Sequence, residues 1–398
     1  MADQSTQSTF SKPSLSTGQF FYSQAVRGVF FQVLLGLAVV FCGYYLYANV
    51  TENLDRQGIA TGFRFMSEES GFDIGESIIA YDSENTYGRA LLVGIFNTLL
   101  VAACGIVLAT ILGVVMGIAR VSQNWFAAKF SSAYVEVVRN VPVVLHVIFW
   151  AAFLRNLPGP KQSWAPFEGL YLNNRGLIFA TPVPHTVYTW VGIALIIAVV
   201  AAFLFARWAR IRRENTGKFF PTLWPIVGIL VGLPLITWIA GGAPLTWDVP
   251  IFRGFNFQGG ASLTPEFVGL LIGITVYTAA FIAEIVRAGI QSVASGQIEA
   301  ARSLGLRPGW IMRYVTLPQA LRVIVPPTTS QYLSLTKNSS LGVLIGYPDL
   351  VNVGNTTLNQ TGQAVEAIAI MMLVYLIISL TISTIMNIYN RSIVLTER

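Results

Sequence analysis

The sequence predicts an all-α polytopic membrane protein with about eight transmembrane helices. Of its 398 residues, 54% are hydrophobic and only 11% are charged, whereas a soluble domain carries about a quarter charged residues. The apolar residues come in continuous runs of about 20, the length needed to cross roughly 30 Å of hydrocarbon. These runs do not alternate between polar and apolar residues, so we expect helices rather than the strands of a closed barrel.

The apolar runs are interpreted as spans one to eight in chain order, separated by polar or charged segments. The stretch before them is rich in Ser and Thr and has no basic region followed by a small-residue cleavage site. We therefore expect no cleavable signal peptide, and residues 1–25 are interpreted as a cytoplasmic tail. The expected spans are residues 26–48, 91–118, 133–154, 187–206, 222–240, 266–288, 323–346 and 364–388.

Basic residues in the loops set the orientation, because cytoplasmic loops carry an excess of Lys and Arg. Two loops are strongly basic, and the two spans between them place both on the same side. Segment 49–90 is acidic and falls outside, and both termini face the cytoplasm. We therefore interpret the basic excess as a topology signal and expect no nucleic-acid binding. The basic residues of the two loops are Arg207, Arg210, Arg212, Arg213, Lys218, then Arg287, Arg302, Arg307, Arg313 and Arg322.

Cysteine and histidine offer no chemistry of their own in this chain. Cys42 and Cys104 fall inside apolar runs, where a free cysteine behaves as a small hydrophobe. His146 and His185 lack accompanying Cys, Asp or Glu at ligand spacing. We therefore expect no metal site.

Residues 299–318 form a loop with more structure than a short connection needs. Ala300 and Ala301 favour a helix, Gly305 can adopt the left-handed conformation that ends it, and Pro308 suits the first turn of a second helix. The sequence therefore predicts two short helices on the cytoplasmic side. A re-entrant or merely connecting loop is the alternative.

The same loop resembles the EAA loop of ABC importer permeases. Glu299-Ala300-Ala301, three residues, Gly305, nine residues and Val315-Thr316-Leu317-Pro318 follow that pattern, in which Ile or Val is usual at the position of Val315. The resemblance implies a coupling helix that docks in a cleft of an ATPase subunit. The coupling residues that it implies are Glu299, Ala300, Ala301, Gly305, Leu317 and Pro318.

Three further stretches are similar to the polar amino-acid subgroup of these permeases. They are Asn97-Thr98-Leu99, the segment YVEVVRNVP at 134–142, and nearly everything from Tyr277 onward, including LTKNSSL at 335–341. In its length and its extra spans, the chain is most similar to the larger permease subunits of general L-amino-acid or glutamate/glutamine/aspartate/asparagine transporters.

The resemblance implies a five-helix type I importer core made of spans two, three, six, seven and eight. Spans one, four and five are then additions, and we expect the inserted pair to pack at the periphery. The expected organisation is a tail (1–25), an extra span with a periplasmic segment (26–90), the first core part (91–155), an insert with two extra spans (156–264) and the second core part (265–398).

Polar residues within the spans are candidates to meet a solute, because polar side chains are costly in lipid and usually face an aqueous cavity or the bundle interior. Counting from the nearest basic boundary residue places both Asn97 and Lys337 in the outer half of the membrane. Pro326-Pro327 are expected to interrupt span seven. The hypothesised outer-half cavity is lined by Asn97, Thr98, Tyr277, Thr278, Thr336, Lys337, Asn338, Ser339 and Ser340.

Alternatives stay open for several of these residues. The Lys337 ammonium is suited to attract a solute carboxylate, but it can equally pair with a partner subunit or extend to the interface. Tyr277 and Thr278 suit interior packing equally well. Two pairs at i, i+3 spacing, Glu136 with Arg139 and Glu284 with Arg287, are candidate ion pairs or inner-gate residues.

The chain lacks the phosphate-binding pattern Gly-x4-Gly-Lys-Ser/Thr, since Gly217-Lys218 is followed by Phe219. It is therefore not expected to be an enzyme or to hold a cofactor, and the resemblance implies that a separate ATPase dimer binds ATP and Mg. The other implied partners are a periplasmic amino-acid-binding protein, a second related permease subunit and the lipid of a bacterial inner membrane. A secondary, ion-coupled amino-acid transporter is the alternative function, and a membrane-embedded enzyme is the third.

Overall fold

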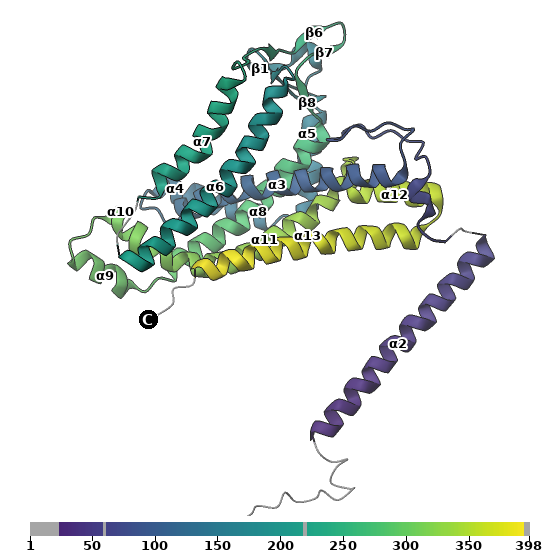
Figure 1. Cartoon of the computed structure of the whole chain (residues 1–398), viewed down its shortest axis with the longest axis horizontal. Helices are drawn as coiled ribbons and strands as arrows, with labels where there is room; N and C mark the ends of the chain where they lie inside the picture. The colour runs from purple at the N-terminus through teal and green to yellow at the C-terminus, as the bar shows by residue number, and fades with distance from the viewer. Residues whose placement is uncertain (1–23, 59–60, 218–220, 394–398) are drawn as a thin grey trace, which may run out of the picture.

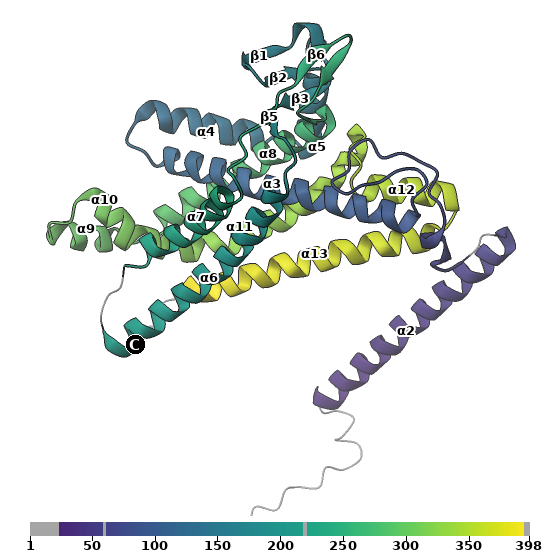
Figure 2. The ribbon, with the colours of Figure 1, turned by 45° about the horizontal axis from the view of Figure 1, so that its top comes forward.

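The computed structural model describes residues 24–58, 61–217 and 221–393 (Figure 1). Apart from Gln24 and Ala25, the predicted cytoplasmic tail lies outside the described residues. The first described helix, α2 (Gln24–Gln57), stands apart from the bundle in both views (Figures 1 and 2). Its apolar window has no buried residue.

Four long helices form the core: α3 (Tyr87–Arg120), α8 (Pro265–Gln291), α11 (Leu317–Asn338) and α13 (Ala364–Ile393). α8 is central, since α3, α5 (Val143–Arg155) and α11 all pack against it. Small residues allow this close approach. A Cβ added at Gly113 of α3 would lie 2.6 Å from Cβ of Ile282 in α8.

The expected count of eight spans is not confirmed. Within the described residues, six helices are long and apolar enough to cross a membrane, or seven if a bent pair counts as one. The six are α2, α3, α6 (Thr186–Thr216), α7 (Leu223–Ala240), α8 and α13. The bent pair is α4 (Trp125–Arg139) and α5, which meet at 103°. The prediction of one continuous helix over 133–154 is therefore wrong, because Pro142 has no backbone N–H and ends the first helix before starting the second.

Span seven also differs from the expectation. α11 begins at Leu317, six residues before the expected boundary, and continues as the 3₁₀ turn η4 (Ser339–Ile345). The prediction that Pro326-Pro327 interrupt this span is wrong, since the helix runs through both. Because proline has no N–H, the carbonyls of Arg322 and Val323 still lose their helical donors.

The insert 156–264 contains strands as well as the expected helix pair. α6 packs against α7, and the strands cluster beyond the ends of this hairpin, at the top of Figure 2. β8 leads through Thr264 directly into α8, so this small β part is tied to the core. The strands are β1 (Trp164–Phe167), β2 (Leu170–Asn173), β3 (Gly176–Phe179) and β8 (Ala261–Leu263) in one antiparallel sheet, then the pairs β4 (Thr181–Pro182) with β5 (Trp247–Asp248) and β6 (Ile251–Arg253) with β7 (Asn256–Gln258).

Short elements mark the two ends of the bundle. The outer end carries the 3₁₀ turn η1 (Arg64–Ser67) and α12 (Leu350–Thr361), and the insert adds the turn η2 (Pro160–Gln162). At the opposite end of Figure 1 lie α9 (Ser295–Ser303) and α10 (Pro308–Ile311), with a single π-helical turn, η3 (Met312–Thr316), leading into α11. The loop 299–318 therefore sits at one end of the bundle, away from α12.

Candidate functional site

The loop 299–318 has the two short helices that the sequence predicts. α9 ends at Ser303, and Gly305 follows in the left-handed region with φ of +73°. The N–H of Gly305 donates to the carbonyl of Arg302 at 2.9 Å, and the N–H of Leu306 donates to that of Ala301 at 3.3 Å. These two bonds form a Schellman motif, which fixes the direction in which the chain leaves the helix. Pro308 then opens α10, as expected.

Large apolar side chains are exposed on this loop. Leu304 is 80% exposed, Tyr314 is 62% exposed, and the Trp310 ring packs edge-on against that of Tyr314. Glu299 and Ala300 are also exposed, whereas Ala301 is buried. Leu317 is exposed and Pro318 half-buried where α11 begins. A cluster of exposed apolar side chains at the end of the bundle is typical of a protein docking site.

One face of α11 is exposed and polar. Ser330, Ser334 and Lys337 follow one another at helical spacing of three or four residues, and all three are exposed. The opposite face, with Leu335 and Thr336, is fully buried against the bundle. Of the predicted cavity residues, Lys337 is thus the one that is exposed in this chain, whereas the others are buried or half-buried. Ser330 and Ser334 were missed because serines spaced along a helix do not reveal which face will be uncovered.

The other predicted cavity residues do not gather in one cavity. Asn97 Nδ2 donates to the carbonyls of Glu76 at 2.8 Å and Pro348 at 2.9 Å, and Thr98 Oγ1 accepts from the N–H of Leu350 at 3.0 Å. Both side chains are fully buried and hold the turn before α12. The hydroxyls of Thr336, Ser339 and Ser340 donate to backbone carbonyls of their own segment, while Asn338 is half-buried and Thr278 is buried.

Tyr277 belongs to a row of aromatic contacts. Its ring centroid lies 5.9 Å from that of His146 and 4.9 Å from that of Phe281. The Arg139 guanidinium carbon lies 5.0 Å from the centre of the Phe281 ring. Arg139 therefore stacks on an aromatic face, and the expected ion pair with Glu136 is not formed among the described residues. The described residues hold no cluster of His, Cys, Asp and Glu fit for a metal ion.

The second candidate pair is present and gains a partner. Glu284 Oε1 accepts a hydrogen bond from Arg287 Nη2 at 2.5 Å, which confirms the predicted ion pair. Glu284 Oε2 also accepts from Nη1 of Arg120, the last residue of α3. Sequence reasoning missed Arg120, although a basic residue at the inner end of a span was a visible signal.

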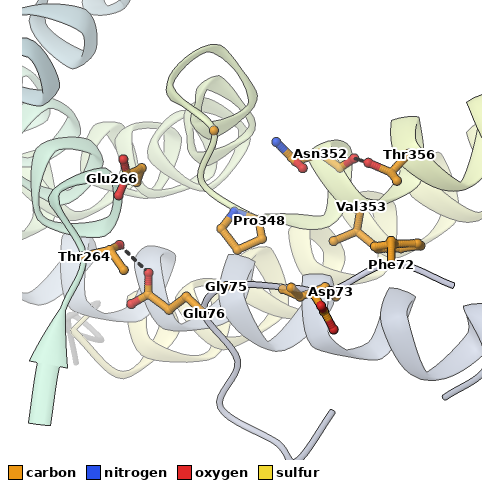
Figure 3. Close-up of a pocket in the computed structure, with 12 residues that line it drawn as sticks. Phe72, Asp73, Gly75, Glu76, Thr264, Glu266, Pro348, Asn352, Val353 and Thr356 are labelled. Atoms are coloured by element: carbon orange, nitrogen blue, oxygen red, sulfur yellow. Dashed lines mark hydrogen bonds between the residues drawn. The ribbon is translucent and has the colours of Figure 1, made fainter. Parts of the chain in front are cut away.

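An acidic pocket of about 320 Å³ opens at the outer end (Figure 3). Thr264 Oγ1 donates to Glu76 Oε2 at 2.5 Å, and Arg155 Nη2 donates to Glu266 Oε1 at 2.8 Å. Burial raises the pKa of Glu76, the Thr264 hydrogen bond opposes this shift, and the charge of Glu266 adds to it. The acidic segment 49–90 was noted from the sequence, but nothing there indicated that Asp73 and Glu76 would line one pocket with Thr264 and Glu266.

Asp349 caps the N-terminus of α12 and is fully buried. Its Oδ1 accepts from the N–H of Asn352 at 3.0 Å, and its Oδ2 accepts from the Tyr375 hydroxyl at 3.4 Å. Burial raises the pKa of Asp349 from 3.8 to about 7, although these hydrogen bonds oppose the shift. Because the folded chain holds this proton more tightly than the unfolded chain, the contribution of Asp349 to stability falls as pH rises from about 4 to 7.

Replacing Asp349 by asparagine is expected to flatten this pH dependence, since asparagine also caps a helix but does not ionise. The apparent Tm of the purified protein in detergent, measured from pH 4 to pH 8, checks the expectation. The variant should gain most over the natural chain at the alkaline end. Parallel curves for the two proteins would show that Asp349 does not ionise in this range.

A helical membrane bundle whose structured end loop exposes large apolar side chains fits the class of membrane proteins that dock a partner protein at one face of the bilayer. The comparisons place the chain within that class. The family model for the binding-protein-dependent transport system inner membrane component matches residues 215–394, and the chain belongs to that family.

Similar proteins cover nearly the whole chain. The general L-amino acid transport system permease protein AapQ of Rhizobium johnstonii is 49% identical over 378 residues, covering 95% of this chain and 94% of that protein. The glutamate/glutamine/aspartate/asparagine transport system permease protein BztB of Rhodobacter capsulatus is 40% identical, with 97% and 98% covered. A solved amino acid ABC transporter aligns with a TM-score of 0.45 and 19% identity, over 77% of this chain and 95% of that one.

The family fixes the general role of the chain. It is a transport permease subunit of the bacterial inner membrane that crosses the bilayer several times, and it is not itself an enzyme. Membership implies an ATPase partner and a binding-protein partner. None of these relatives favours an ion-coupled secondary transporter, the alternative that the sequence left open.

Proposed function

We propose that the chain forms half of the translocation path of an ATP-driven importer of L-amino acids, with a second, related permease subunit forming the other half. The amino-acid class is supported by the relatives, whose names specify general L-amino acids or glutamate, glutamine, aspartate and asparagine. In this proposal the ATPase pair holds ATP and Mg, and the chain holds no cofactor.

The polar face of α11 carries the proposal. Ser330, Ser334 and Lys337 are exposed on a helix that packs inside the bundle on its other side. A charged or strongly polar face is costly in lipid, so this face needs water or another protein against it. A water-filled path between two permease subunits would place both water and protein against this face. The Lys337 ammonium could then bind the carboxylate that all amino acids share.

The loop 299–318 supplies the coupling in this proposal. The exposed side chains of Leu304, Trp310 and Tyr314 would dock on the ATPase, with Ala300 allowing close approach of the two backbones. Closure of the ATPase pair on ATP would move α9 as a rigid lever and change which side of the membrane the path faces.

Replacing Lys337 by methionine is expected to lower uptake at least tenfold for every amino acid transported, because a charge-assisted hydrogen bond contributes about 1.5–3 kcal/mol. The complete complex, reconstituted in vesicles with its ATPase and binding protein, is the system to measure. Lys337→Arg should retain part of the uptake. Lys129→Met, which removes an exposed charge from α4, is the matched control and should leave uptake unchanged. If Lys337→Met keeps full uptake, Lys337 does not bind solute in the path.

A second measurement tests the function itself. Uptake should require ATP on the side of the vesicle membrane where the ATPase is bound. It should persist when a proton ionophore is added. If the ionophore abolishes uptake and ATP depletion does not, the result would favour a secondary transporter. A stable, active preparation that contains no ATPase would overturn the proposal.

A further inference from the structure

The inner ends of α3 and α8 are joined by a three-residue charge network. Glu284 of α8 accepts hydrogen bonds from Arg120 of α3 and from Arg287 one turn further along α8. The Arg120 side chain is only 12% exposed and that of Glu284 27% exposed. Salt and water therefore screen this pair less than they screen a surface pair.

Glycines bring the helices together around the network. A Cβ added at Gly117 of α3 would lie 2.6 Å from Cβ of Val286 and 2.8 Å from the carbonyl oxygen of Ala283. On the other side of α8, a Cβ at Gly289 would lie 2.3 Å from Ile324 Cγ1 of α11. The inner end of α8 is thus held between α3 and α11.

The same end of α8 is the entry point of the coupling loop. α8 ends at Gln291 and α9 begins at Ser295, so only three residues separate the two helices. The N–H of Ser292 still continues the hydrogen-bond pattern of α8, since it donates to the carbonyl of Ala288 at 2.9 Å. Glu284 lies seven residues before the end of α8, roughly 10 Å along its axis. A displacement of α9 therefore passes to α8 close to the charge network.

α3 has no such connection through the chain. Its C-terminal end is followed by α4, and the loop 299–318 is continuous with α8 and α11 only. Packed glycine surfaces can slide past one another in small shear movements. A directional ion pair resists that sliding, because its hydrogen bonds hold only in one register.

We propose that Arg120 is a positioning residue that makes α3 move with α8 when the ATPase displaces the coupling loop. The inference rests on the proposed function, because it assumes that the loop receives the movement. The hydrogen bond of the Arg120 side chain within the described residues goes to Glu284, so Arg120 acts through Glu284.

The reconstituted complex with Arg120→Met tests this role. ATP hydrolysis stimulated by the loaded binding protein should stay within about twofold of the natural complex, while the number of solute molecules imported per ATP falls at least tenfold. Arg120→Lys keeps the charge and should restore part of that ratio. Glu284→Gln is a second variant at the same contact, and adding it to Arg120→Met should lower the ratio no further, since both changes break one interaction.

The matched control is Arg155→Met, which breaks the Arg155–Glu266 ion pair between α5 and the outer end of the same helix α8. It should leave solute imported per ATP near the natural value, because that pair lies away from the loop. An unchanged ratio in Arg120→Met overturns the inference, and so does an equal fall in Arg155→Met. Joint loss of hydrolysis, uptake and subunit assembly in both Arg120→Met and Glu284→Gln would show a purely structural role and also overturn it. Failure of the natural complex to import with ATP would instead contradict the proposed function.

Discussion

Replacing Gly305 by valine is expected to lower ATP-driven uptake 100-fold or more. The chain should still insert into the membrane and fold into its helical bundle. Gly305 has φ of +73°, a conformation in which a β-branched residue is strongly disfavoured. Strain of about 1–3 kcal/mol at this exposed turn would be relieved by a local change of path. The two bonds that orient α9 against α10 would then be lost, and with them the shape of the docking surface. Uptake, stimulated ATP hydrolysis and co-purification of the ATPase measure the effect.

Gly309→Ala is the matched control in the same loop. Gly309 lies in the first turn of α10, has no positive φ, and a Cβ there would meet nothing within 4 Å. We expect this variant to keep the uptake and ATPase binding of the natural chain. If Gly305→Val also keeps them, the left-handed turn is not needed for coupling and the docking site must lie elsewhere.

The loop was predictable because its determinants are local. Gly305 and Pro308 act on the backbone at their own positions, so the end of α9 and the start of α10 follow from a few neighbouring residues. The i, i+3 pair of Glu284 and Arg287 is local in the same sense, since helical spacing alone brings the two side chains together.

The outer residues could not be placed in this way. Asn97 in a membrane span suggests a solute cavity, yet its amide donates to the backbone carbonyls of Glu76 and Pro348, which lie 21 and 251 positions away in the chain. A backbone carbonyl has no signature in the sequence. The buried role of Asn97 depends on how the turn before α12 folds back on α3, and hydropathy does not encode that.

The expected count of eight spans is not confirmed for a related reason. A hydropathy window detects length and composition, so residues 133–154 appeared as one span although Pro142 separates two helices that meet at 103°. The polar face of α11 lowers its hydropathy, and this helix is not among the candidate spans. The same polar side chains that weaken its signal as a membrane helix make it the best candidate for the path.

Replacing Gly113 by valine is expected to destabilise the bundle more than any exposed substitution. A Cβ at this position would lie 2.6 Å from Cβ and 2.7 Å from Cγ2 of Ile282, and 3.0 Å from the carbonyl oxygen of Ala279. Because the backbone of α8 cannot move aside as a flexible side chain can, α3 and α8 must separate. Overpacking of this kind typically costs about 1–3 kcal/mol, occasionally more, so the apparent Tm of the purified protein in detergent should fall by several degrees.

Gly36→Val in α2 separates this packing effect from the change in helix propensity. Both positions are helical glycines, but a Cβ at Gly36 would meet nothing within 4 Å. Valine has a higher helix propensity than glycine, so Gly36→Val should leave the apparent Tm unchanged or slightly higher. Equal losses in the two variants would mean that contact between α3 and α8 at Gly113 is not what holds the bundle together. A loss confined to Gly113→Val would show that the stability of the core depends on this close approach of α3 to α8.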